Sequence, residues 1–132
     1  MKLLLDTHTF IWWASKSTKL PRNVRASCED PANTLLFSVV SAWEMQIKIQ
    51  LGKLKVSRPL ADLITHHQRV NQMRILRADL EHVLALDALP AHHKDPFDRL
   101  LIAQAIVEDV FLVSGDPEFS SYPVKVFWLS HS

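Results

Sequence analysis

The chain has 132 residues, of which 48% are hydrophobic, and its 15 basic and 14 acidic side chains give a formal net charge of +1. This length and composition predict a single domain over residues 1–132, because two cores would each be marginal and only two glycines occur. The balanced charge excludes a global field that would attract nucleic acid or an anionic membrane, so such a partner would have to be bound locally.

The N-terminus and the cysteine content predict a soluble cytoplasmic protein. Asp6 and His8 interrupt the first apolar stretch, which a signal peptide would keep continuous. No window approaches the roughly 20 apolar residues of a membrane span, so no membrane partner is expected. Cys28 is the single cysteine and cannot form an internal disulfide, which fits a reducing compartment.

Short apolar runs alternate with amphipathic segments along the chain. Strands are predicted at 2–5, 33–38, 74–76, 110–114 and 124–129. Helices are predicted at 7–15, 20–30, 38–52, 57–72, 78–89 and 95–109. Gly52 is expected to end the third helix, and Ser57 is a candidate cap of the fourth. The alternation predicts an α/β fold with a central, mainly parallel sheet flanked by helices, and in such sheets ligands bind beyond the carboxyl ends of the strands.

Two aspartates directly follow predicted strands. Asp6 comes after residues 2–5, and Asp116 comes after "FLVSG". Both are therefore predicted to lie at the carboxyl edge of the sheet, where a ligand would bind. Aspartate is also an ordinary turn and cap residue, so each of them taken singly could have a purely structural role.

Glu44 falls on the apolar face of a predicted helix. It shares a helical stripe with Val40, Ile47 and Leu51, so a carboxylate is expected on the side that faces the core. The alternative is a capping box, in which Ser41 caps the helix and Glu44 follows three residues later. A capping box does not explain why the apolar stripe is interrupted.

Two aspartates also open the last long helix, in "HKDPFDRLLIAQA". Asp95 can cap this helix, and Pro96 suits its first position. Asp98 lies one turn further on and begins the apolar face. Its alternative role is to complement the helix dipole from the first turn. We expect Asp95 to act as the cap and Asp98 to point inward.

Four carboxylates brought together without a cation would repel one another, and some would have to take up protons. A divalent cation removes this repulsion, and oxygen ligands without cysteine suit Mg²⁺ or Mn²⁺ rather than zinc. Such an ion can lower the pKa of a water molecule and neutralise a phosphate, which predicts hydrolysis of a phosphodiester. A competing zinc site has little support, because no two of the seven histidines have the i, i+4 spacing of a zinc-binding helix.

Four blocks of the sequence together resemble a known family. They are "LLLDTHTFIWW", "FSVVSAWEMQIKIQLGKL", "LPAHHKDPFDRLLIAQA" and "LVSGDPEFSSYPVKVFW". In order and spacing they are similar to the signature blocks of PIN-domain proteins, and most similar to the VapC-like toxins of type II toxin-antitoxin systems. The resemblance extends from about Leu3 to Trp128 and implies a Rossmann-like, three-layer PIN fold.

The resemblance implies a metal-dependent endoribonuclease whose acidic residues are Asp6, Glu44, Asp98 and Asp116. Asp6 and Asp98 would be the principal Mg²⁺ ligands, with Mn²⁺ as a possible substitute. Glu44 and Asp116 would support the metal site and help to orient the attacking water. The family also implies a cognate antitoxin encoded nearby, which would inhibit cleavage, and a toxin homodimer.

Hydroxyl and basic side chains are expected around this pocket. Thr7 and Ser114 fall where the family often has a small hydroxyl, although hydrogen bonding to a neighbouring backbone group is an equal alternative. RNA contacts would need local positive charge, and Arg99, which follows Asp98 directly, is expected at the rim. The other basic candidates are Lys48, Lys53, Lys55, Arg58 and Lys94. Each of these can equally be a solvated charge on a helix face.

The segment "FIWW" places aromatic residues on two sides of the first helix. Phe10 and Trp13 share one side, and Trp12 lies on another. One tryptophan, Trp12 or Trp13, could therefore belong to an interface, where tryptophan is favoured. A helix buried on two sides is the alternative.

Two other classes of protein compete with the nuclease. Aspartate-based phosphotransferases generally have a second aspartate two residues after the first, and here that position is His8. A PIN-like module that binds protein or RNA without catalysis would keep the fold and lose the metal chemistry. Metal binding and the effect of Asp6→Asn or Asp98→Asn on RNA cleavage separate these alternatives.

Overall fold

The computed structural model describes residues 1–91 and 95–128 of the chain. Five strands form one sheet in the order β3-β2-β1-β4-β5, and every neighbouring pair is parallel. The strands are β1 (Lys2–Leu5), β2 (Thr34–Ser38), β3 (Arg74–Leu76), β4 (Phe111–Val113) and β5 (Val126–Phe127). The α-helices are α1 (Thr7–Ala14), α2 (Arg22–Glu29), α3 (Val39–Gln50), α4 (Leu60–Val70), α5 (Leu80–Leu84) and α6 (Pro96–Glu108). The predicted three-layer α/β architecture with a parallel sheet is confirmed.

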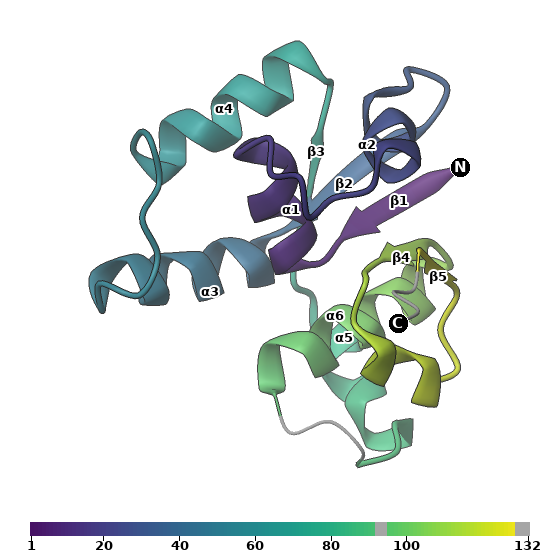
Figure 1. Cartoon of the computed structure of the whole chain (residues 1–132). Helices are drawn as coiled ribbons and strands as arrows, with labels where there is room; N and C mark the ends of the chain where they lie inside the picture. The colour runs from purple at the N-terminus through teal and green to yellow at the C-terminus, as the bar shows by residue number, and fades with distance from the viewer. Residues whose placement is uncertain (92–94, 129–132) are drawn as a thin grey trace.

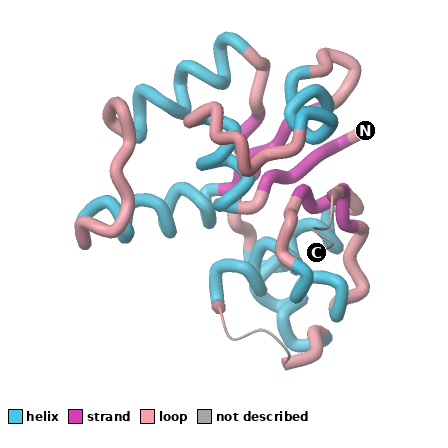
Figure 2. Tube along the Cα trace, viewed as in Figure 1, coloured by secondary structure: helices cyan, strands magenta, loops and turns pink. Residues whose placement is uncertain are grey.

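Helices cover both faces of the sheet. In Figures 1 and 2, α1, α2 and α4 lie on one side of the strands, and α5 and α6 lie on the other. The side chains of β1 alternate accordingly: Leu3 and Leu5 join one hydrophobic cluster, whereas Leu4 joins the other. A parallel strand covered on both faces needs a continuous apolar run, which explains the sequence "LLL".

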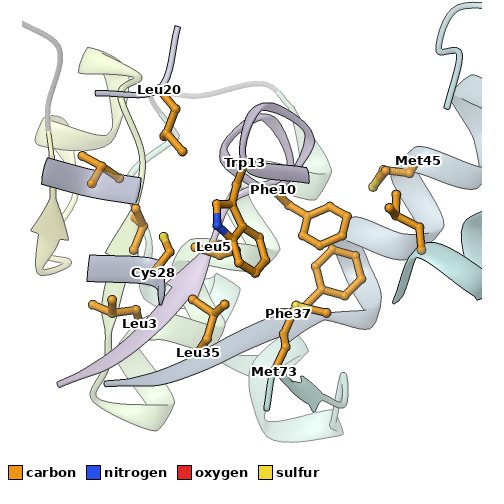
Figure 3. Packing of buried hydrophobic residues seen from close by; sticks show 13 residues of the cluster. Leu3, Leu5, Phe10, Trp13, Leu20, Cys28, Leu35, Phe37, Met45 and Met73 are labelled. Atoms are coloured by element: carbon orange, nitrogen blue, oxygen red, sulfur yellow. The ribbon is translucent and has the colours of Figure 1, made fainter. Parts of the chain in front are cut away.

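The first cluster holds α1 against the sheet. The rings of Phe10 and Phe37 lie 4.3 Å apart between centroids, and Trp13 points into the same core from the next turn of the helix (Figure 3). The Trp13 indole N–H donates a 3.1 Å hydrogen bond to Glu29 of α2. Cys28 is buried in this cluster, and burial raises the pKa of its thiol to about 12, so it is an unreactive core residue.

The second cluster fixes the orientation of α6. Leu101, Ile102 and Ala105 are buried in this cluster together with Leu4 of β1 and Leu112 of β4. This is the face that the sequence predicted for the helix, and Asp98 precedes it by one turn. The packing of α6 therefore determines where the Asp98 carboxylate can lie.

Three local predictions were wrong or too long. Ser57 does not cap α4; Pro59 stands at the cap position with an extended backbone, and the helix begins at Leu60. Arg58, as the residue before a proline, is disfavoured in the helical region, so a helix that starts at Arg58 from a cap at Ser57 is not favoured. The helix predicted at 78–89 is the short α5 followed by a 3₁₀ turn at Ala85–Ala88, and extended Leu89 precedes Pro90. The last strand is limited to Val126–Phe127, and residue 129 of the prediction lies outside the described residues.

Candidate metal and active site

Asp6 and Asp116 follow β1 and β4, which are neighbours in the sheet. The strand order changes direction beside β1, so this pair of strands forms the topological switch point where α/β sheets bind ligands. The backbone N–H of Asp6 donates to the carbonyl of Val113 at 3.1 Å, which ties the two strand ends together. Figure 1 shows α1 leaving the sheet at this edge.

Each of these two aspartates also caps a helix. An Asp6 carboxylate oxygen accepts from the backbone N–H of Thr9 at 2.8 Å, at the start of α1. Asp116 accepts from the backbone N–H of Glu118 at 3.0 Å, at the start of the 3₁₀ helix Pro117–Ser121. Both aspartates therefore have the structural role of a helix cap that the sequence left open. This role does not exclude metal binding, because a carboxylate has further lone pairs that can face a cation.

Glu44 enters the same region from α3. Its side chain is buried, and its Oε1 accepts a 2.7 Å hydrogen bond from the Thr7 hydroxyl. The Thr7 oxygen also lies 3.0 Å from the Ser41 hydroxyl. Thr7 has one proton, and the carboxylate is the stronger acceptor, so Ser41 is expected to donate to Thr7. The second oxygen, Oε2, accepts from Lys48 Nζ at 2.8 Å.

The capping-box alternative for Glu44 is wrong. Ser38, not Ser41, caps α3, and its hydroxyl accepts from the backbone N–H of Val40 at 3.0 Å. The helix begins three residues earlier than a capping box at Ser41 requires. Ser41 is instead buried beside Thr7, so Glu44 is held by tertiary contacts.

Asp98 lies in the first turn of α6, three residues after Asp95, the cap that the sequence predicted. The Asp95 Oδ1 atom accepts from the backbone N–H groups of Phe97 and Asp98 at 2.8 and 3.2 Å, and Pro96 occupies the first helical position. The predicted role of Asp95 as the cap is confirmed by this geometry.

The pKa values place the acids in one electrostatic environment. Burial, followed by the charges of Asp95, Asp6, Glu44 and Asp116, raises the pKa of Asp98 to about 8. The pKa of Asp6 is also raised by burial, although hydrogen bonds from the Ser114 hydroxyl and Thr9 oppose this effect. Mutual repulsion of this kind is the behaviour expected of carboxylates that share a site for a cation.

The four acids do not form a closed ligand cage. Among residues 1–91 and 95–128, the one group of three ligand-type side chains whose donor atoms lie within 4.8 Å of one another is Glu81, His82 and Glu108, on α5 and α6. The wider spacing of the four acids fits Mg²⁺, which keeps several water molecules and takes only one or two carboxylates directly. A donor set of carboxylates and hydroxyls without thiols also fits this hard cation.

The Glu81, His82 and Glu108 group has a structural explanation. His82 Nδ1 accepts from the backbone N–H of Asp79 at 2.9 Å, so the proton of the neutral ring must be on Nε2. Nε2 lies 2.8 Å from Glu108 and donates to it. A metal at Nε2 would have to displace that proton, so this contact instead joins α5 to α6.

The hydroxyl and basic residues predicted near the pocket divide into several groups. Thr7 and Ser114 are both buried beside the acids. Lys48 binds Glu44, and Arg99 donates to the Pro90 carbonyl at 2.7 Å, which anchors the preceding loop. The exposed basic side chains of the prediction are Lys53, Lys55 and Arg58, and Lys94 lies outside the described residues.

The sequence interpretation missed two features. Ser41 was considered only as a cap, and its contact with Thr7 joins residues that are distant in the sequence, so no local pattern could reveal it. The Glu44–Lys48 pair did have a local signal, because an acid four residues before a lysine is a favourable pair on a helix.

The parallel sheet and the carboxylates at its switch point define an α/β protein with an acidic candidate site. A family model described as PIN domain matches residues 3–125, and the chain therefore belongs to the PIN domain family. Proteins of this family are generally nucleases. No curated protein sequence matches the chain significantly.

Solved structures with the same fold come from several bacteria. A chain of DNA-bound VapBC from Salmonella typhimurium has a TM-score of 0.69 at 18% identity, with 96% of each chain covered. A chain of VapBC2 from Rickettsia felis, bound to a fragment of its promoter, has a TM-score of 0.68 at 18% identity and the same coverage. A chain of VapBC-5 from Mycobacterium tuberculosis has a TM-score of 0.59 at 17% identity, with 97% of each chain covered. At this identity the likeness concerns the fold.

Proposed function

We propose that this PIN-domain protein is a VapC-like toxin of a type II toxin-antitoxin system and acts as a metal-dependent endoribonuclease. The main support is the electrostatics of one pocket: Asp98 has a pKa raised to about 8 by burial and by neighbouring acids. The pocket lies at the switch point of the sheet, and a divalent cation would relieve its repulsion. The similarity to chains of VapBC complexes supports the toxin assignment.

Asp6 and Asp98 would hold the ion, and the ion would supply charge neutralisation at the scissile phosphate and a more acidic attacking water. Asp116 adds a carboxylate beside Asp6 at the neighbouring strand end and can orient that water. Glu44 acts differently, since Thr7 and Lys48 already occupy one lone pair on each of its oxygens. Its role is to fix the position of negative charge beside the ion. Lys48 limits the repulsion that this buried charge creates.

The proposal includes a cognate antitoxin, a homodimer and a cytoplasmic location. Apolar side chains of α5 are exposed, with 71% of Leu80 and 64% of Leu84 accessible, which is expected of a surface that another protein covers. No helix among residues 1–91 and 95–128 is long and apolar enough to cross a membrane.

The direct test is expression of the chain with and without the neighbouring small open reading frame, followed by sequencing of RNA 5′ ends. We expect growth arrest with cuts at defined sites, relief by the neighbour, and loss of the cuts in Asp6→Asn and Asp98→Asn. Asp109→Asn is a matched control, because Asp109 lies at the other end of α6 and pairs with Lys125. Unchanged cuts in the two site variants would contradict the metal mechanism, whereas metal binding without any cleavage would favour a binding module.

A further inference from the structure

A cavity adjoins the acidic pocket on the side of α1. Its volume is about 270 Å³, and its lining includes Asp6, Asp116, His8, Trp12 and Pro117. This volume is below the range of roughly 300–1,000 Å³ that is typical of sites for drug-sized ligands, so the cavity suits one small group. Because two candidate metal ligands form part of its wall, any group bound there lies next to the reacting phosphate.

Trp12 differs from its neighbour in a way that packing alone does not explain. Trp13 is 2% exposed and its indole N–H is bonded to Glu29, as expected of a core residue. The ring of Trp12 is only partly buried and lines the cavity. His8, one turn earlier on the same helix face, is exposed, and its ring centroid lies 6.0 Å from that of Trp12. The two ring planes are tilted by 46°, so the rings form an angled aromatic surface, the His8–Trp12 pair, on which Trp12 offers the larger stacking face.

A third aromatic residue, Trp128 in the C-terminal segment, also lies next to Trp12. The Trp128 ring lies 6.1 Å from that of Trp12, between centroids. Gly115, which lines the cavity between β4 and Asp116, lies directly under Trp128: a Cβ at this position would come within 2.5 Å of that ring. Trp128 therefore lies close to both Trp12 and Gly115, and these contacts connect the Trp12 ring to the segment that carries Asp116.

A positive charge accompanies the aromatic surface. Lys19 Nζ lies 5.7 Å from the centroid of the Trp12 ring. A cation next to a stacking surface is the combination that binds single-stranded nucleic acid, in which the base stacks and the cation contacts the neighbouring phosphate. A base in an RNA duplex is not accessible for such stacking, whereas a base in a single strand is.

We propose that this cavity binds one unpaired base of a single-stranded RNA, which stacks on the Trp12 ring beside His8 and belongs to a nucleotide next to the scissile phosphate. The inference rests on the proposed ribonuclease activity and adds a substrate requirement to it. The metal site recognises any phosphodiester; the cavity selects strands whose base can turn outward at that position.

The test combines a protein variant with a base deletion. The substrates are short single-stranded RNA oligonucleotides that carry the cut sequence, either intact or with an abasic ribose at a position next to the cut. We expect Trp12→Ala to lower kcat/KM on intact RNA by about 5- to 150-fold, the usual effect of losing one base–aromatic stack. Trp12→Phe should retain most of the rate. On the abasic RNA, wild type and Trp12→Ala should cut at the same rate, because the interaction is already absent.

A matched control is Ile11→Ala. Ile11 is the adjacent residue of α1 and lines a separate cavity, so this variant should lower the rate on both RNAs equally or not at all. Thermal melting checks that each variant is folded.

If Trp12→Ala cuts intact RNA at the wild-type rate, or slows intact and abasic RNA by the same factor, the base site is refuted while the ribonuclease stands. If Trp12→Ala instead loses only its inhibition by the antitoxin, the cavity belongs to a protein partner and the inference is also wrong. If the wild type cuts no RNA at all, the proposed function fails first, and the inference fails with it.

Discussion

Cation binding at the acidic pocket is expected to depend on pH through the raised pKa values of Asp6 and Asp98, and Asp98 sets a lower limit for the effect. Burial and the neighbouring acids raise the pKa of Asp98 from 3.8 to about 8. A divalent cation needs the ionised carboxylate, so below that pH its binding must release a proton. With this pKa, roughly 1% of the molecules have an ionised Asp98 at pH 6 and roughly half do at pH 8. Ionisation of Asp98 alone should therefore raise the apparent affinity for Mg²⁺ or Mn²⁺ by roughly 50-fold over this interval, and the raised pKa of Asp6 can only add to this change.

Isothermal titration calorimetry with Mn²⁺ measures this coupling directly. Repeating each titration in buffers with different ionisation enthalpies counts the protons released, and we expect at least about 0.9 per ion at pH 7 and at least about 0.5 at pH 8, the contribution of Asp98. Asp98→Asn should remove the Asp98 contribution to the proton release together with most of the affinity. Asp109→Asn, whose carboxylate is exposed at the opposite end of α6, should retain both. Equal affinity at pH 6 and pH 8, or release of fewer than about 0.3 protons at pH 7, would refute the reasoning.

Three further predictions concern stability and the helix cap. Because the folded pKa of Asp98 lies above the unfolded value of 3.8, the folded state binds more protons between about pH 4 and pH 8, and stability falls as pH rises through this window. Asp98→Asn should therefore stabilise the ion-free protein at pH 8 by on the order of 1–3 kcal/mol after allowance for solvent screening, as measured by urea unfolding, and a loss of stability would contradict this. Thr7→Val leaves a Glu44 oxygen without its donor and should destabilise by about 1–3 kcal/mol in the same assay, whereas Thr7→Ser should be nearly neutral. Asp95→Ser should retain the helix cap and most RNA cleavage, and it should shift the pH dependence of cation binding to lower pH, because Asp95 raises the pKa of Asp98. Asp95→Ala should lower the stability by about 1 kcal/mol, because it removes the cap. Equal losses of stability in the two variants would be inconsistent with a capping role.

The arrangement of strands and helices could be predicted because its causes are local. Alternating apolar runs and amphipathic segments require a parallel sheet covered on both faces, and the carboxyl ends of its strands share one edge. Asp6 and Asp116 follow two such ends, so their positions in the fold followed from the strand assignment. Asp98 was predicted from helix periodicity together with the cap at Asp95, both of which are properties of a single helix.

The contacts that fix Glu44 could not be predicted in the same way. Its neighbour Thr7 lies 37 residues away in the sequence, and their 2.7 Å hydrogen bond depends on how α1 packs against α3. The true start of α3 at Ser38 was equally hidden, because Ser38 and Ser41 both have a residue type suited to a cap. Ser38 is the cap because the strand β2 ends there and its hydroxyl also reaches Gln104 of α6 at 2.6 Å. Tertiary packing thus decided between two locally similar signals.

The doubled aspartate of α6 connects the stability of the fold to its chemistry. Asp95 accepts hydrogen bonds from backbone N–H groups at the start of the helix, and this fixes the backbone of the first turn, from which the Asp98 side chain projects. The apolar residues behind Asp98 are buried against the sheet, so α6 cannot rotate to carry the carboxylate into water without exposing them. Without a cation the carboxylate is destabilised by burial and by its neighbours, and its raised pKa records that cost. A bound cation stabilises the ionised carboxylate and so offsets part of this cost, and the part that it offsets contributes to the affinity for the metal.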